Sequence, residues 1–228
     1  MYRLIVALVA VMGIALFLTG TAAQQPGAKP AAEAAKPVVI EEAVLVVFVD
    51  EPAHHFHRVH EFFLKKHMKS AAEQVRVAAG FMKLEAARAT DEGKEGLNAS
   101  VKELERLADD LEKGVDVSGN ALSHAFARAH HALANHHYLK AAEEHAKNAP
   151  EKAGHDLKAA AVHVEQAAAW LGHDLDKGAL DVLKGARLVG GKLIKGAGWA
   201  PDEVGKAIED IGKLTEEVGK KIEPTTKT

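Results

Sequence analysis

Apolar residues recur at helical spacing along almost the whole chain after Pro52. These segments are rich in Ala, Leu, Glu and Lys, which favour helices, and their apolar positions repeat every three or four residues. The pattern predicts an all-α fold: a helical bundle of two related antiparallel hairpins, followed by a C-terminal pair of amphipathic helices. We expect helices at about 53–89 with a break near His67 to Lys69, 99–113, Ser118 or Asn120 to 147, 151–172, 176–196 and 201–223.

A stretch of twenty residues has a partial repeat later in the chain. HHFHRVHEFFLKKHMKSAAE at 54–73 and HAFARAHHALANHHYLKAAE at 124–143 agree at eight positions, three of which are histidine. A weaker match aligns 69–87 with 151–169, which would make the second copy longer by about three helical turns. These matches predict a duplicated, histidine-rich helical domain over residues 52–172.

The amino terminus has the order of a secretory signal. One arginine is followed by an apolar run and then by small residues, so we assign residues 1–23 to a signal peptide cleaved after Ala23. The Ala- and Pro-rich residues 24–37 are typical of a flexible linker, and the Val-rich residues 38–51 favour an extended or strand-like segment. The expected location is the periplasm or the medium.

The first hairpin, FLKKHMKSAAEQVRVAAGFMKLEA, resembles the helix-turn-helix units of tetratricopeptide-type proteins, but it lacks their Trp, Gly, Tyr and Pro signature. Two such hairpins behind a signal peptide are similar in layout to the YfdX family of exported helical proteins. The resemblance implies a helical exported protein connected with acid stress. It transfers no site residues.

Histidine is the unusual component, with 14 residues, whereas cysteine is absent. Without residues 1–23 the chain has 28 basic and 32 acidic residues, a net charge of −4, which does not favour nucleic acid as a partner. No nucleophile elbow, phosphate-binding loop or His-Glu-x-x-His motif is present. We therefore expect a protein that is not an enzyme.

Four histidines flank the duplicated apolar stripe. On a helical wheel His60 and His67 border the first copy of the stripe, and His130 and His137 border the second. Packed antiparallel, the two copies would bring His60 to His137 and His67 to His130. These cross-helix pairs would each bind a metal ion, ligate a haem without covalent attachment, or serve as ordinary half-buried side chains.

The opposite face of the first copy offers a compact chelate. His54, His57 and Glu61 follow one another at intervals of about one helical turn. Imidazole with carboxylate and no thiolate suits Zn, Ni, Co or Cu(II), which makes this cluster the best metal candidate in the sequence. A solvated polar face explains it almost as well. The remaining histidines of the later helices are scattered and carry no site prediction: His136, His145, His155, His163 and His173.

The C-terminal residues 173–228 form a glycine-containing amphipathic pair. Val204, Ile211 and Val218 recur every seven residues and are each followed by Gly-Lys, which indicates close approach to another helix. The partner is this domain or a second copy of the chain. An interfacial membrane helix is the alternative, but the acidic residues of the segment make membrane contact the weaker interpretation.

Two functions follow from these patterns. The first is binding or buffering of a divalent transition metal through the outer cluster or the cross-helix pairs. The second is a stress or interaction protein whose histidines switch on protonation, since histidine titrates near pH 6.5. Non-covalent haem binding is a third.

The export prediction can be tested in the host. We expect the mature chain to begin at Gln24, because cleavage after Ala23 follows a small-residue motif. Amino-terminal sequencing of the extracytoplasmic fraction measures this. Recovery of the intact chain from the inner membrane would contradict it.

Overall fold

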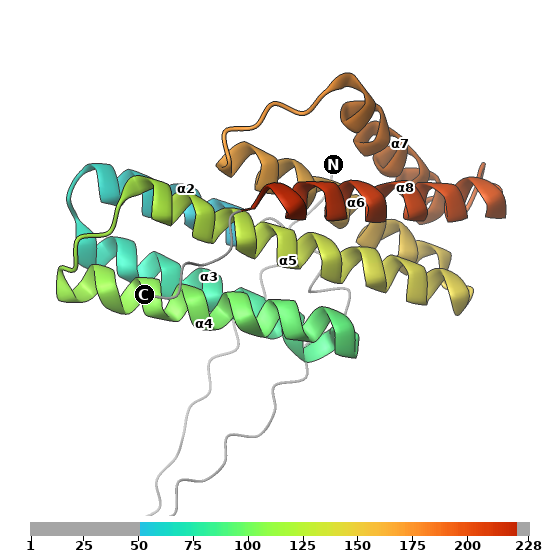
Figure 1. Cartoon of the computed structure of the whole chain (residues 1–228). Helices are drawn as coiled ribbons and strands as arrows, with labels where there is room; N and C mark the ends of the chain where they lie inside the picture. Colours follow the sequence, from blue (N-terminus) through green and yellow to red (C-terminus); the bar gives the residue numbers. More distant parts are fainter. Residues whose placement is uncertain (1–50, 223–228) are drawn as a thin grey trace, which may run out of the picture. The chain divides into compact units, whose positions relative to one another are not determined.

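The computed structural model describes residues 51–222. They belong to one compact unit, Ile40–Thr228, and form seven α-helices and no strand, which confirms the all-α prediction for this part (Figure 1). The helices are α2 (Glu51–Leu64), α3 (Met68–Arg88), α4 (Asp91–Lys113), α5 (Gly119–Ala146), α6 (Pro150–Trp170), α7 (Lys177–Ile194) and α8 (Pro201–Lys221).

Three predicted segments fall on residues that the structure does not describe. The signal peptide at 1–23, the linker at 24–37 and residues 38–50 of the strand-like segment all lie outside the described residues, and Glu51 already begins α2. Within 51–222, no helix combines the length and the apolar character needed to cross a membrane.

Helix α4 begins eight residues earlier than predicted. The sequence DEGKEGLN offers little apolar periodicity, but the Thr90 hydroxyl accepts a hydrogen bond from the Gly93 amide at 3.2 Å, and Asp91 lies in the first turn. An N-cap and an acidic first turn both stabilise a helix start. Gly93 is buried and lies close to α5. A Cβ added to it would be 3.3 Å from the Cα of His136.

The other helix ends agree with the sequence pattern. The Ser118 hydroxyl accepts from the Ala121 amide at 3.1 Å, as an N-cap should, and the first long segment breaks at residues 65–67, where Lys66 has φ 62°. Helices α3 and α6 are both 21 residues long, whereas α5 has 28 residues and α2 has 14. The duplication itself stays a prediction.

Helix α5 belongs to two hydrophobic cores. Its residues up to Leu133 pack with α2, α3 and α4, and its residues from Ala134 onward pack with α6, α7 and α8. Figure 1 shows α5 (yellow-green) between the earlier helices and the later ones. The largest buried side chains of the first core include Phe56, Met82, Leu104 and Phe126, and those of the second include Leu157, Leu183, Leu193 and Ile211.

Glycines bring the later helices close together. A Cβ on Gly154 of α6 would lie 2.7 Å from the carbonyl oxygen of Gly190 of α7, and a Cβ on Gly190 would lie 2.7 Å from that of Gly154. In the glycine repeat of α8, Gly212 faces the Tyr138 ring and Gly219 faces the His131 ring of α5, whereas Gly205 meets no atom within 4 Å. Close approach therefore occurs at two of the three repeated positions.

The α6–α7 contact can be tested by adding one methyl group. We expect Gly154→Ala to lower the free energy of unfolding by about 1–3 kcal/mol, because the backbone of Gly190 leaves no room for a Cβ. Gly191→Ala is the matched control, since nothing lies within 4 Å of its Cβ and alanine favours helix by up to about 1 kcal/mol. Urea denaturation measures both; equal stability of the two variants would contradict the close contact.

Candidate metal centre

A cluster of polar side chains lies in the middle of the bundle, at the point of α5 where the two cores meet. It is built from three helices. All of its members are buried except one arginine, which is 17% exposed. The members are Glu85 and Arg88 of α3, His130, His136 and His137 of α5, and Asp156 and His163 of α6.

The antiparallel packing of α5 against α6 forms two residue pairs of this cluster. His130 meets His163, and seven residues further along α5 His137 meets Asp156, seven residues earlier on α6. Seven residues are about two helical turns, so both pairs fall on the facing sides of the two helices. The register of one hairpin thus places four polar side chains in the interior.

His137 is oriented by a carboxylate. Its Nδ1 lies 2.7 Å from Oδ1 of Asp156, so the Nδ1–H donates to the carboxylate, and Nε2 is left without a partner in the buried interior. A carboxylate on one ring nitrogen fixes the tautomer and raises the basicity of the other nitrogen, as it does for metal-bound histidines. Nε2 of His137 is therefore prepared to act as a ligand.

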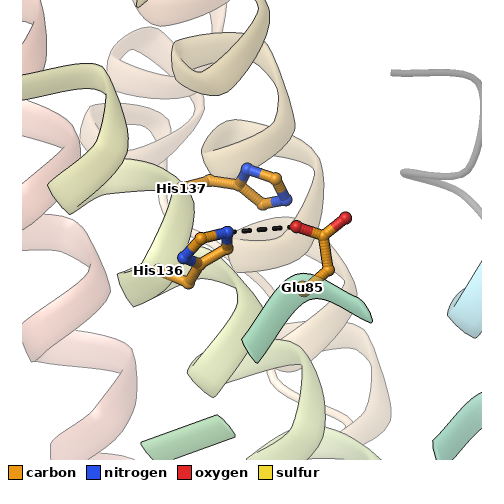
Figure 2. A group of neighbouring side chains, drawn as sticks. All are labelled: Glu85, His136 and His137. Atoms are coloured by element: carbon orange, nitrogen blue, oxygen red, sulfur yellow. Dashed lines mark hydrogen bonds and ion pairs between the residues drawn. The ribbon is translucent and has the colours of Figure 1, made fainter. Parts of the chain in front are cut away.

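Glu85 and His136 lie beside it (Figure 2). Nε2 of His136 donates to Oε2 of Glu85 at 3.0 Å, and Arg88 donates from Nε to the same oxygen at 2.8 Å. Glu85, His136 and His137 each offer a ligand atom, and these atoms lie within 4.8 Å of one another. They form the only group of three or more such residues that meets this limit within residues 51–222.

The spacing suits a small ion after a modest contraction. With metal–ligand bonds of about 2.0–2.1 Å, a tetrahedral site has ligand atoms about 3.4 Å apart. The Glu85–His136 distance of 3.0 Å is already close to that edge, and His137 would have to approach by at most about 1.4 Å. Coordination by His136 would also require its Nε2 proton to move or to leave.

A second histidine pair adjoins the group. The two Nδ1 atoms of His130 and His163 are 3.1 Å apart, so one ring donates and the other accepts, and neither Nε2 has a partner. The His163 ring stacks on His137 with a centroid separation of 5.5 Å, and Phe56 packs edge-on against His130 at 5.3 Å. The four histidines therefore form one continuous buried cluster.

The pKa values of Glu85 and His136 are both lowered, and in each case burial and the interactions with neighbours act against one another. Burial alone would raise the pKa of Glu85, but the hydrogen bond from His136 and the charges of His137 and Arg88 outweigh it and lower the pKa to about 2. Burial lowers the pKa of His136 to about 4, against the opposing hydrogen bond to Glu85. Near neutral pH, Glu85 is therefore an anion and His136 a neutral ring, which is the form that binds metals.

The second pair is neutral for the same reason. Burial, with a smaller contribution from His57, lowers the pKa of His130 to about 3. The pKa of His163 lies well below the usual value, because its ring is fully buried and neighbours His130 and His137. Of this hydrogen-bonded pair, only the ring that donates from Nδ1 keeps a free lone pair, at its Nε2.

The predicted outer cluster does not come together. His54, His57 and Glu61 are all exposed on α2 and do not form a group within the 4.8 Å limit. The His57 ring packs against Trp170 at 5.2 Å, and the His54 ring packs edge-on against His55 at 5.5 Å. These aromatic contacts hold the side chains apart, so metal binding there stays a prediction without geometric support.

The predicted cross-helix pairs differ from the observed ones. Helix α2 does run antiparallel to α5, with Phe56 stacked on Phe126 and Phe63 beside Gly119, but this register places His60 opposite the first turn of α5. His137 is therefore roughly 20 Å further along α5. His60 contacts Trp170 at 5.9 Å instead.

His67 does not lie on a helix, because α2 ends at Leu64 and α3 begins at Met68. It lies exposed in the turn between α2 and α3, with its ring 6.4 Å from that of Phe62. Its expected partner, His130, meets His163 of α6. The prediction was thus right that His130 and His137 face another helix and wrong about which helix.

Five members of the cluster were not predicted. For an antiparallel pair of helices, residues equally far from the connecting turn lie opposite each other. Counted from the α5–α6 turn, His130 falls within about one helical turn of His163, and His137 within about one turn of Asp156. The sequence therefore held a signal for His163 and Asp156. Glu85, Arg88 and His136 gave no such signal, because they meet only through the packing of α3 on α5.

Comparisons with known proteins add no assignment: no family model, curated protein or solved structure matched the chain.

The buried histidines predict a steep loss of stability in mild acid for the metal-free protein. The pKa values of His130 and His136 are lowered in the folded state, so their contribution is complete above the unfolded value near 6.5 and is lost as the pH falls below it. Between pH 6.5 and 4.5 each should remove about 2–3 kcal/mol from the free energy of unfolding. Glu85 adds little in this window, since its pKa of about 2 is lowered from 4.5.

Urea denaturation at pH 7.5, 6.5, 5.5 and 4.5 measures this slope. His130→Leu removes one titrating group and should flatten the slope, whereas His54→Ala, at an exposed position, should leave it unchanged. A wild-type stability that is constant from pH 6.5 to 4.5 would contradict the neutral burial of these rings.

Proposed function

We propose that the protein binds a divalent transition metal ion in the interior of the bundle and buffers or sequesters it outside the cytoplasm. The ligands are Glu85, His136 and His137. One observation carries the proposal: His137 is buried, its Nδ1 is bonded to Asp156, and its Nε2 has no hydrogen-bond partner, while its ring lies next to Glu85 and His136.

Unpartnered ring nitrogens support a ligand. Four buried histidine nitrogens in this cluster have no hydrogen-bond partner, and each buried polar atom without a partner opposes folding by about 1–3 kcal/mol. An ion bound by Nε2 of His137 would offset this energy at one of the four atoms. This energetic gain supports a ligand at His137.

The donor set indicates the class of ion. Two imidazoles and one carboxylate, with no cysteine in the chain, suit Zn, Ni, Co or Cu(II) rather than the all-oxygen sites of calcium and magnesium. Three protein ligands leave a fourth position open. An open position suits reversible binding and exchange, which fits a buffering role better than a closed structural site.

Charge also supports a divalent cation. Glu85 and Asp156 place two carboxylates in the interior, opposed by Arg88 and His137, whereas His130 and His136 contribute no charge near neutral pH. Carboxylate oxygens are ligands for divalent transition metals.

Calorimetry of the tag-free protein with Zn²⁺, Ni²⁺, Co²⁺ and Cu²⁺ at pH 7.5 tests the proposal. We expect at least one of the ions to bind more tightly than the millimolar range and to raise the thermal unfolding midpoint. Glu85→Gln and His137→Gln should weaken binding by about 100-fold or more, and Asp156→Asn by about 10- to 100-fold because it only orients His137. Circular dichroism establishes that each variant is folded.

The matched control is the exposed outer cluster. A triple variant, His54→Gln, His57→Gln and Glu61→Gln, should bind the same ion with wild-type affinity. Loss of binding in this triple variant, with binding kept in Glu85→Gln and His137→Gln, would move the site to the surface of α2. No binding tighter than millimolar for any of the ions would end the proposal.

A further inference from the structure

Arg88 is the cation of the buried cluster, and it lies where the cluster approaches solvent. Its side chain is 17% exposed, whereas those of His136, His137, Glu85 and Asp156 are 0%, 1%, 6% and 5% exposed. It sits at the last turn of α3, one helical turn after Glu85. Of these five side chains it is thus the one with the most direct contact with water.

The guanidinium spans both carboxylates. Nε of Arg88 donates to Oε2 of Glu85 at 2.8 Å, and its Nη2 lies 3.6 Å from Oδ1 of Asp156. Both oxygens also serve the histidines, because Oε2 accepts from His136 and Oδ1 accepts from His137. Arg88 therefore engages the Glu85 oxygen that lies next to His136, and the same oxygen that orients His137.

Arginine cannot avoid this competition by losing its proton. Its guanidinium stays charged at any pH at which the protein is folded, whereas a histidine can release a proton when a metal binds. An ion held by Glu85, His136 and His137 would lie close to this fixed positive charge. Like charges a few ångströms apart in a poorly hydrated interior repel strongly.

We infer that Arg88 is a built-in competitor for the metal site, a cation that occupies Glu85 when no ion is bound and must withdraw when one binds. This inference rests on the proposed metal binding. Withdrawal is open to the side chain because it is long and already partly in water. The consequence is an affinity held below what the ligand set alone would give, so that the ion can be released again.

The test is a gain of affinity. Arg88→Gln removes the charge but keeps a long polar side chain, and it should bind the ion at least about tenfold more tightly than the wild type, because the repulsion is gone. Arg88→Lys keeps the charge and should stay near the wild-type affinity. Calorimetry with the ion that binds the wild type most tightly supplies the dissociation constants.

Arg128→Gln is the matched control. Arg128 is 20% exposed and pairs with Glu103, which is 15% exposed, so the same substitution removes a partly buried ion pair that includes none of the proposed ligands. Its metal affinity should equal that of the wild type. A general effect of lost positive charge would instead raise the affinity of both variants equally and would overturn a specific role for Arg88.

The outcomes separate the two proposals. If the wild type binds and Arg88→Gln binds with equal or lower affinity while remaining folded, Arg88 is not a competitor and the metal site stands. If Arg88→Gln alone binds, competition is supported and the wild-type buffering function fails. If neither binds any ion, both proposals fail.

Discussion

The structure depends on the burial of a polar network at the centre of its longest helix. Helix α5 supplies apolar residues to one core before Leu133 and to another after Ala134, and its histidines lie around this change. Unpaired polar groups in such a position would oppose folding strongly. They are tolerated because Glu85 and Asp156 reach them from two other helices and because three of the rings stay neutral.

The same network connects helices that are far apart in the sequence. Glu85 and Arg88 come from α3 in the first core, whereas Asp156 and His163 come from α6. Close packing of the later helices supports this arrangement, since Gly154 lets α7 approach the helix that carries Asp156 and His163. A ligand at the centre would therefore contact residues that belong to both halves of the bundle, and the proposed metal binding would then influence the stability of both.

Function in this arrangement is a matter of balance. The histidines and Glu85 offer donors, but the 3.0 Å hydrogen bond between His136 and Glu85 and the guanidinium of Arg88 would have to rearrange for the proposed ion to bind. Such opposing terms would favour reversible binding over permanent retention. The location on three helices makes the site sensitive to packing changes far from its ligands.

The sequence by itself determined the all-α class, the helices and most of their ends, because caps, prolines and apolar periodicity are local signals. It also marked His130 and His137 as facing a neighbouring helix. Counting residues from the α5–α6 turn could have indicated α6 as that neighbour, whereas only the tertiary structure decided that α2 brings His60 to Trp170 and that Glu85 meets His136. Helical periodicity fixes which side of a helix is buried, but the partner and the register depend on side-chain packing between distant segments, which no local pattern encodes.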